Sequence, residues 1–153
     1  MNRLLQLGWA LRRRLIGALR LRTRGVKVMV FNGRGELLLI RNGYGDTRSF
    51  VLPGGEVGRG EDALAAALRE LVEEVGIAAA DLRLLGNYQA SGEGKRDSIS
   101  LFEGSSSQPI RIDGREVSEA GFFPLEALPE TTSPATRRRV RQWQDGGPFG
   151  GAW

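Results

Sequence analysis

One segment near the middle of the chain limits the folds that this sequence can adopt. Between Asp62 and Val75, apolar side chains recur every three or four residues, which is the period of an amphipathic α-helix. Gly76 stands where a helix C-terminus favours glycine, and the bend-forming triplet at 53–55, Pro-Gly-Gly, precedes the helix. Such a helix must cover its apolar side with other elements, so the flanking segments have to supply that surface.

The flanking segments are short runs typical of β-strands, rich in branched and aromatic residues and separated by glycine-rich or polar turns. The predicted strands cover residues 26–31, 36–41, 49–52, 82–89, 98–102, 109–112 and 120–123. The first two form a predicted hairpin around the turn at 32–35. A second helix is predicted over 135–143, because Ser133 and Pro134 suit its N-cap and first helical position. Strands and helices mixed in a chain of 153 residues predict a single α+β domain.

Both ends of the chain differ from this central pattern. Residues 1–24 predict an extra N-terminal amphipathic helix rich in arginine, residues 25–145 the α+β domain, and residues 146–153 a flexible Gly-rich tail. We expect the leucines of the N-terminal helix to pack on the domain or on a second copy, which predicts a homodimer weakened by deletion of the helix. Attachment to anionic lipid or nucleic acid and an organellar transit peptide are the alternatives. The arginines at 12–14 interrupt the apolar run of a secretory signal, and no run is long enough for a membrane span, so we expect a cytoplasmic protein.

The inventory of side chains limits the chemistry that the chain can perform. It contains no cysteine and no histidine, which excludes thiolate or imidazole zinc sites, a Ser-His-Asp triad and a cysteine nucleophile. Carboxylates, arginine, lysine, hydroxyls and the backbone remain. Hard cations such as Mg2+ and Mn2+ prefer oxygen ligands, so a site for one of these ions fits the inventory.

Charge is distributed unevenly along the chain. Residues 1–35 hold nine basic residues and no acidic residue, whereas residues 36–136 hold nine basic and 17 acidic residues. The net charge of +4 therefore averages two basic ends with an acidic middle. The basic total does not by itself indicate nucleic-acid binding, because the acidic middle is where a cation site would lie.

The acidic side chains of the central helix share one side. At about 100° per residue, Glu70, Glu73 and Glu74 fall within one stripe beside the apolar one. Like charges three or four residues apart destabilise a helix by about 0.2–0.5 kcal/mol per pair, and a bridging divalent cation would remove that cost. The helix alone leaves a second interpretation open, a solvated acidic surface with Arg59 and Arg69 nearby.

The residues around this helix resemble a known signature. From Gly55 to Ile77 the sequence matches G-x5-E-x7-R-E-U-x-E-E-x-G-U at every defined position, where U is a bulky aliphatic residue. This pattern is similar to the complete box of the Nudix hydrolases. The stretch 50–55 resembles the aromatic-x-x-Pro-Gly-Gly motif usual in that family, and a coarser similarity extends from about Val26 to Pro129. The resemblance implies an α/β/α sandwich around a mixed β-sheet, and the first 25 residues lie outside it.

The resemblance implies a hydrolase that depends on Mg2+ or Mn2+. Nudix enzymes cleave a nucleoside diphosphate linked to another group by attack of water on phosphorus. Glu70, Glu73 and Glu74 match the catalytic carboxylates of the box, which hold the metal. The backbone carbonyl of Gly54 is a further implied ligand, since a residue without Cβ lets the chain approach an ion closely, and Gly55 supports the site structurally.

Residues outside these ligands complete the expected site. Glu61 and Arg69 match a pair that braces the loop and the helix in the family. Glu103, after a predicted strand, resembles an additional catalytic acid that some members carry. The proton of the attacking water would pass to Glu70 or to a carboxylate outside the box, for which Glu93 and Asp97 are alternatives.

Four side chains are candidates for contacting the substrate. Arg41, on a predicted strand, could hold a phosphate, although an arginine on an edge strand is often merely exposed. Tyr44, Phe50 and Tyr88 could stack on a base, although ordinary roles in the core or in loops are favoured for such aromatic residues.

The leading hypothesis is hydrolysis of the diphosphate linkage in a small nucleotide, with a nucleoside triphosphate or nucleotide sugar favoured over ADP-ribose. The proline and the tyrosine that mark ADP-ribose and dinucleoside polyphosphate hydrolases after the box are missing. One alternative is a Nudix domain that binds nucleotide or RNA without turnover. The other is a pyrophosphohydrolase acting on RNA 5′ ends.

Overall fold

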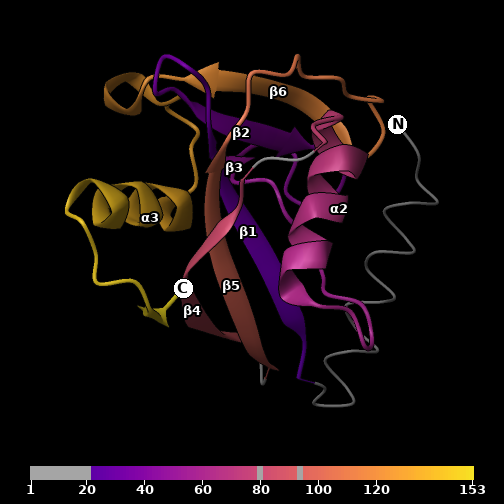
Figure 1. The fold of residues 1–153 in the computed structure, drawn as a ribbon, viewed down its shortest axis with the longest axis vertical. Helices are drawn as coiled ribbons and strands as arrows, with labels where there is room; N and C mark the ends of the chain where they lie inside the picture. Colours follow the sequence, from indigo (N-terminus) through magenta and orange to yellow (C-terminus); the bar gives the residue numbers. More distant parts are fainter. Residues whose placement is uncertain (1–21, 79–80, 93–94) are drawn as a thin grey trace.

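The computed structural model describes residues 22–78, 81–92 and 95–153, which form a mixed β-sheet with one α-helix on each side (Figure 1). The strands are β1 (Arg24–Phe31), β2 (Leu37–Asn42), β3 (Phe50–Val51), β4 (Arg83–Gly92), β5 (Lys95–Ser105), β6 (Val117–Phe123) and β7 (Gly151–Ala152). The helices are α2 (Ala63–Val75) and α3 (Pro134–Gln144), and a 3-10 turn, η1, covers Leu125–Ala127.

Two parallel pairs, β1 with β5 at the centre and β4 with β7 at one edge, make the sheet mixed. The strand order is β3-β2-β1-β5-β4-β7, and β6 adds to β2. β1 lies parallel to β5 along its whole length, from Arg24 opposite Ser98 to Phe31 opposite Ser105. β1 and β2 form the predicted hairpin but meet only near their turn, where Phe31 faces Leu37. Beyond the turn β2 pairs antiparallel with β6.

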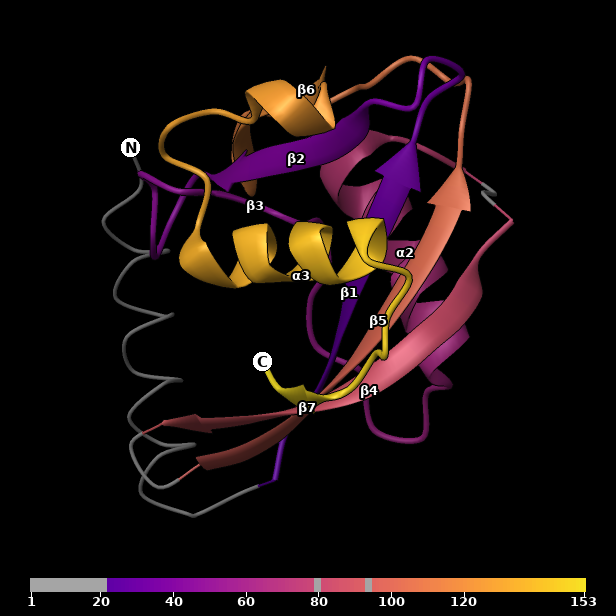
Figure 2. The same cartoon turned by 90° about the vertical axis from the view of Figure 1, so that its left-hand side faces the viewer.

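Alternation along the strands divides the apolar core into two halves. Val26, Val28 and Val30 of β1 belong to the half that includes the buried residues of α2. Met29 of β1 and Tyr88 of β4 belong to the half that packs against α3. Because α2 and α3 cover opposite faces of the sheet (Figure 2), the arrangement is an α/β/α sandwich.

Capping residues define both ends of α2. The Asp62 carboxylate accepts hydrogen bonds from the N–H groups of Leu64, at 3.0 Å, and Ala65, at 3.3 Å. Gly76 ends the helix with a φ of 67°, a conformation that favours glycine. The helix is where the periodicity predicts it. Its buried side differs from the predicted apolar stripe, because Leu64 belongs to that stripe but is 39% exposed. The buried residues are Ala66, Ala67, Leu71, Glu74 and Val75.

Among the residues that the structure describes, the other predicted helix and strands occur near their expected positions, with one exception. Ser133 caps α3 by accepting a hydrogen bond from the N–H of Thr136, and Pro134 occupies the first turn. Residues 109–112, however, do not form a strand. The N–H of Arg111 donates to the carbonyl of Val75 at 2.8 Å, so this segment follows the end of α2 instead of joining the sheet.

The C-terminal segment differs from the flexible tail expected for residues 146–153. Gly151–Ala152 forms β7, which lies parallel to β4. The ring of Trp153 packs edge-on against Tyr88, with 5.3 Å between centroids. Arg139 of α3 lies over both rings and donates to the carbonyl of Ala152 at 3.0 Å. These aromatic and arginine contacts hold a segment whose glycine content alone predicted flexibility.

The predicted N-terminal helix falls almost wholly outside the described residues, together with the homodimer that depends on it. Of residues 1–24, only 22–24 are described, and Arg24 already begins β1. Within the described ranges, every helix is too short or too polar to cross a membrane.

Candidate active site

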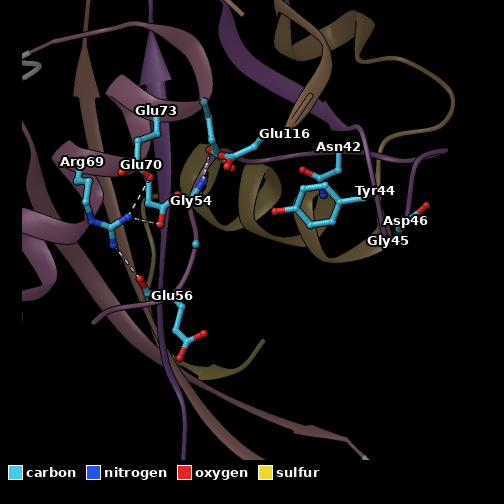
Figure 3. A pocket seen from close by; sticks show the side chains of 12 residues that line it. Asn42, Tyr44, Gly45, Asp46, Gly54, Glu56, Arg69, Glu70, Glu73 and Glu116 are labelled. Atoms are coloured by element: carbon cyan, nitrogen blue, oxygen red, sulfur yellow. Dashed lines mark hydrogen bonds and ion pairs between the residues drawn. The ribbon is translucent and has the colours of Figure 1, made fainter. Parts of the chain in front are cut away.

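A pocket of about 520 Å³ lies between α2 and the loops that follow β2 and β3 (Figure 3). Its volume is within the range of small-molecule sites. The basic side chain among its lining residues is Arg69, whereas its acidic side chains are Asp46, Glu56, Glu70, Glu73, Glu74 and Glu116. This excess of carboxylates would repel a phosphate-bearing ligand unless cations offset it.

The Pro-Gly-Gly segment at 53–55 forms one wall of the pocket and lies against β1. The carbonyls of residues 53 and 55 accept hydrogen bonds from the N–H groups of Val28, at 3.0 Å, and Val26, at 2.9 Å. Gly54 has a φ of 140°, and a Cβ at this position would collide with the backbone of Val26 and Lys27. Glycine is therefore required for the close approach of this wall to β1.

Glu74 is the most buried carboxylate of the pocket, with 8% of the residue exposed. Its Oε2 accepts a hydrogen bond from the N–H of Gly54 at 2.8 Å. Burial raises the pKa of Glu74 from 4.5 to about 7, whereas the charge of Lys27 and the Gly54 N–H act in the opposite direction. Burial also raises the pKa of Glu70, against the effect of Arg69. Two carboxylates of α2 are thus held where their charges lack full solvation.

Arg69 connects the acidic side chains at the mouth of the pocket. Its guanidinium binds both carboxylate oxygens of Glu61, at 2.9 and 3.0 Å, which lowers the pKa of Glu61 to about 2. The same group donates to Glu70 at 2.8 Å, to Glu73 at 3.1 Å and to the carbonyl of Glu56 at 3.0 Å. The Glu61–Arg69 pair therefore ties the loop after β3 to α2, which is the brace that the sequence resemblance implies.

Lys27 of β1 contacts the same wall of the pocket, the segment that includes Gly54. Its Nζ donates to the carbonyl of Leu52 at 2.9 Å and lies 3.5 Å from the carbonyl of Gly54. Burial lowers the pKa of Lys27, and the charges of Glu74 and Glu70 partly offset this effect. No motif in the sequence marks Lys27, because a lone lysine on a strand belongs to no recognisable pattern.

The donor chemistry of the pocket fits a hard divalent cation. Carboxylates and a backbone carbonyl are the ligands that such ions prefer. A Cβ on Gly55 would collide with the Glu70 carboxylate, so glycine lets this carboxylate lie against the wall of the pocket. Across 22–78, 81–92 and 95–153, no three acidic side chains are arranged so that together they could hold a metal ion. Glu70 and Glu73 are turned toward Arg69, so metal binding requires these flexible side chains to rotate.

Comparison with known proteins agrees with this geometry. A family model described as NUDIX domain matches residues 21–144. This chain belongs to the Nudix family. An uncharacterised Nudix hydrolase of Pseudomonas aeruginosa is 37% identical over 119 residues, which cover 72% of this chain and 68% of the relative. A Bacillus subtilis protein named as a candidate 8-oxo-dGTP diphosphatase is 33% identical over 125 residues, 81% of each chain.

A solved structure shows the same fold. The crystal structure of a MutT Nudix hydrolase from Burkholderia pseudomallei matches with a TM-score of 0.71 and 26% identity, over 80% of this chain and 98% of that one. The protein is therefore an enzyme of the Nudix hydrolase family. Members of this family generally use divalent metal ions and act on nucleotide compounds.

Not every residue expected in the Nudix site lies in the pocket. Glu103 is on the opposite face of the sheet, where its carboxylate accepts hydrogen bonds from Arg83 and from the indole of Trp143 in α3. Asp97 accepts a hydrogen bond from the hydroxyl of Thr23 and lines a different pocket. Glu93 is outside the described residues. The structure therefore does not bring Glu103 or Asp97 to the carboxylates of the Nudix box.

Of the expected substrate contacts, Tyr44 lines the acidic pocket. Arg41 packs over the ring of Phe50 at 4.4 Å and pairs with Glu119 at 3.3 Å. Phe50 is 3% exposed and Tyr88 is fully buried, and the Tyr88 hydroxyl donates to Gln142 at 2.9 Å. Phe50 and Tyr88 are thus core residues whose rings cannot stack on a base, which agrees with the ordinary core role favoured for such aromatics.

Glu116 is a pocket residue that no motif in the sequence indicates. It precedes β6, and its carbonyl accepts a hydrogen bond from the N–H of Gly43 at 2.9 Å. Figure 3 shows Glu116 near Gly54, between Glu70 on one side of the pocket and Tyr44 on the other. Its charge adds to those that raise the pKa values of Glu74 and Glu70. Only the pairing of β2 with β6, which places Asn42 opposite Val117, brings this loop to the pocket.

Proposed function

We propose that this protein hydrolyses the diphosphate linkage of a small nucleotide, with a nucleoside triphosphate as the favoured substrate and Mg2+ or Mn2+ as the required ion. The observation that carries the proposal is the pocket in which the carboxylates of α2 meet the Gly54 segment. The name of the Bacillus subtilis relative, which the chain matches over 81% of its length, favours a nucleoside triphosphate over a nucleotide sugar.

The proposed ligands are the carboxylates of Glu70, Glu73 and Glu74 and the backbone carbonyl of Gly54. Glu74 has the most defined position, because the Gly54 N–H holds its Oε2 at 2.8 Å. Glu116, on the far wall of the pocket, is a further oxygen donor. A divalent ion bound by these groups would offset the charge of the phosphates, polarise phosphorus and lower the pKa of a water molecule.

Glu70 is the proposed general base. Burial raises the pKa of this carboxyl group in the metal-free pocket, and the carboxylate oxygen that would not bind the ion is the proposed proton acceptor. In the proposed reaction, water forms a bond to phosphorus and its proton passes to a carboxylate oxygen of Glu70. The bridging oxygen leaves with the diphosphate, and the other product is a nucleoside monophosphate. Tyr44, across the pocket, is the proposed contact for the nucleoside.

The test is a matched pair of substitutions on the two faces of the sheet. Glu74→Gln keeps an acceptor for the Gly54 N–H but removes the charge, so we expect turnover to fall by about 100-fold or more. Glu103→Gln changes a carboxylate outside the pocket and should retain turnover within about threefold. The assay follows 8-oxo-dGTP, dGTP, a nucleotide sugar, ADP-ribose and 5′-triphosphate RNA with Mg2+ and with Mn2+. Nearly unchanged turnover in Glu74→Gln contradicts the assignment of the pocket.

A further inference from the structure

Lys27 is a charged residue of the site that the proposed reaction does not use. Its side chain extends from β1 beneath the wall at 52–54, and its Nζ lies 2.9 Å from the Leu52 carbonyl and 3.5 Å from the Gly54 carbonyl. The carbonyls of residues 53 and 55 point to β1 instead, where backbone N–H groups bind them. The Lys27 ammonium therefore contacts the carbonyls of Leu52 and Gly54, which do not pair with the backbone of β1.

The charge of the same ammonium acts on the carboxylates that are proposed to hold the metal. Its charge interacts with Glu74 first and with Glu70 second, and Glu74 itself is bonded to the N–H of Gly54 at 2.8 Å. One cation thus lies against a proposed carbonyl ligand and within the field of two proposed carboxylate ligands. Arg69 forms ion pairs with Glu70 and Glu73. Lys27 is therefore left as the counter-charge of Glu74.

We propose that the Lys27 ammonium competes with the divalent ion for the Gly54 carbonyl and for the negative charge of Glu74. This competition sets the affinity of the pocket for the metal. This inference rests on the proposed function, because it takes Gly54 and Glu74 as metal ligands. A second pocket of about 270 Å³ shares residues 54–56 with the acidic one and is also lined by Lys27. It offers the ammonium a place to which it turns when the metal binds.

The direction of the effect follows from charge. A lysine that only braced the wall would help the metal, so its removal would weaken binding. A competing cation opposes the metal, so its removal strengthens binding. A single charge and a double charge a few ångströms apart repel each other even in a solvated site. We expect loss of the Lys27 charge to tighten Mn2+ binding about tenfold, which corresponds to about 1.4 kcal/mol.

The experiment measures Mn2+ binding without substrate, by the loss of the free-ion signal in electron paramagnetic resonance. Lys27→Gln removes the charge but keeps an N–H donor, Lys27→Met removes both, and Lys27→Arg keeps both. We expect tighter binding in the Gln and Met variants and a change below twofold in the Arg variant. Glu74→Gln is the control that locates the ion and should bind it weakly. Unchanged or weaker binding in the Gln and Met variants overturns the proposal.

A second measurement uses the unsubstituted protein, in case the neutral variants do not fold. The 15N resonance of the Lys27 ammonium, assigned as the signal that Lys27→Arg lacks, should shift as Mg2+ saturates the site. A Lys27 signal that stays constant at saturation contradicts displacement. The two proposals fail differently. If no variant hydrolyses any nucleotide but Lys27→Gln binds Mn2+ more tightly, the proposed function is wrong and this inference stands.

Discussion

The buried carboxylate of Glu74 makes the metal-free enzyme sensitive to pH. Burial raises the pKa of Glu74 from 4.5 to about 7 in the folded protein. Because the folded-state value lies above the unfolded one, the folded protein binds more protons between these pH values. Its stability therefore falls as pH rises through this window, and the loss is complete above the folded pKa. Glu74→Gln mimics the protonated form and should abolish this part of the pH dependence.

The magnitude follows from the size of the change in pKa. One pKa unit corresponds to about 1.4 kcal/mol, so the change from 4.5 to about 7 sets an upper limit of about 3 kcal/mol. We expect metal-free Glu74→Gln to exceed the original protein in free energy of unfolding by about 1–3 kcal/mol at pH 8. The difference should vanish below about pH 4.5.

Urea denaturation with EDTA, followed by circular dichroism at several pH values, measures this difference. EDTA is needed because a bound divalent ion would stabilise the charged carboxylate. Glu103→Gln is the control, since its carboxylate is outside the pocket. If Glu74→Gln is less stable than the original protein at pH 8, or if the difference is the same at every pH, the assigned cause of the shift is refuted.

Two further predictions concern the wall and the brace of the pocket. Gly54→Ala should lower the free energy of unfolding by about 3 kcal/mol or more, because a Cβ at this φ collides with β1. Urea denaturation measures this free energy, and a loss below about 1 kcal/mol contradicts the prediction. Arg69→Lys should weaken Mn2+ binding about tenfold or more, because lysine lacks the planar fork that binds both oxygens of Glu61. Equal Mn2+ affinity in Arg69→Lys would show that the brace does not position the ligands.

Much of the fold was predictable because the local signals agree with one another. Asp62 and Gly76 mark the ends of α2, and Ser133 marks the start of α3, through caps that depend only on neighbouring residues. The strands follow the alternation of apolar residues. The segment at 109–112 looks like a strand by composition, but its backbone bonds to the end of α2, which no local signal encodes.

The candidate site was predictable only where its residues are close in the sequence. Helical spacing alone places Glu70, Glu73 and Glu74 on one side of α2. Glu116 reaches the pocket through the pairing of β2 with β6. Lys27 contacts the wall of the pocket because residues 52–55 pack on β1. Both contacts join residues that are far apart in the sequence. The position of Glu103 along β5 was not enough to place it in or out of the site. Alternation along a strand does not reveal which face of the sheet carries the metal site.

The C-terminal segment illustrates a different limit. Six of the last eight residues are glycine, proline or alanine, and such a composition predicts flexibility. The order comes from two side chains elsewhere in the sequence, Arg139 and Tyr88, which hold Trp153 and the backbone of β7. Composition indicates the flexibility of an isolated segment. It does not indicate the surface against which the segment packs in the folded protein.

The central claim is that the acidic pocket uses a divalent ion to direct water onto a phosphoanhydride. The most direct test incubates the protein with nucleoside triphosphates in H2(18)O, with Mg2+ or with EDTA, and analyses the products by mass spectrometry. We expect a nucleoside monophosphate that carries one 18O atom, unlabelled inorganic diphosphate, and no turnover in EDTA. Equal turnover in EDTA, or no product from any nucleotide of the panel with Mg2+ or Mn2+, would contradict it.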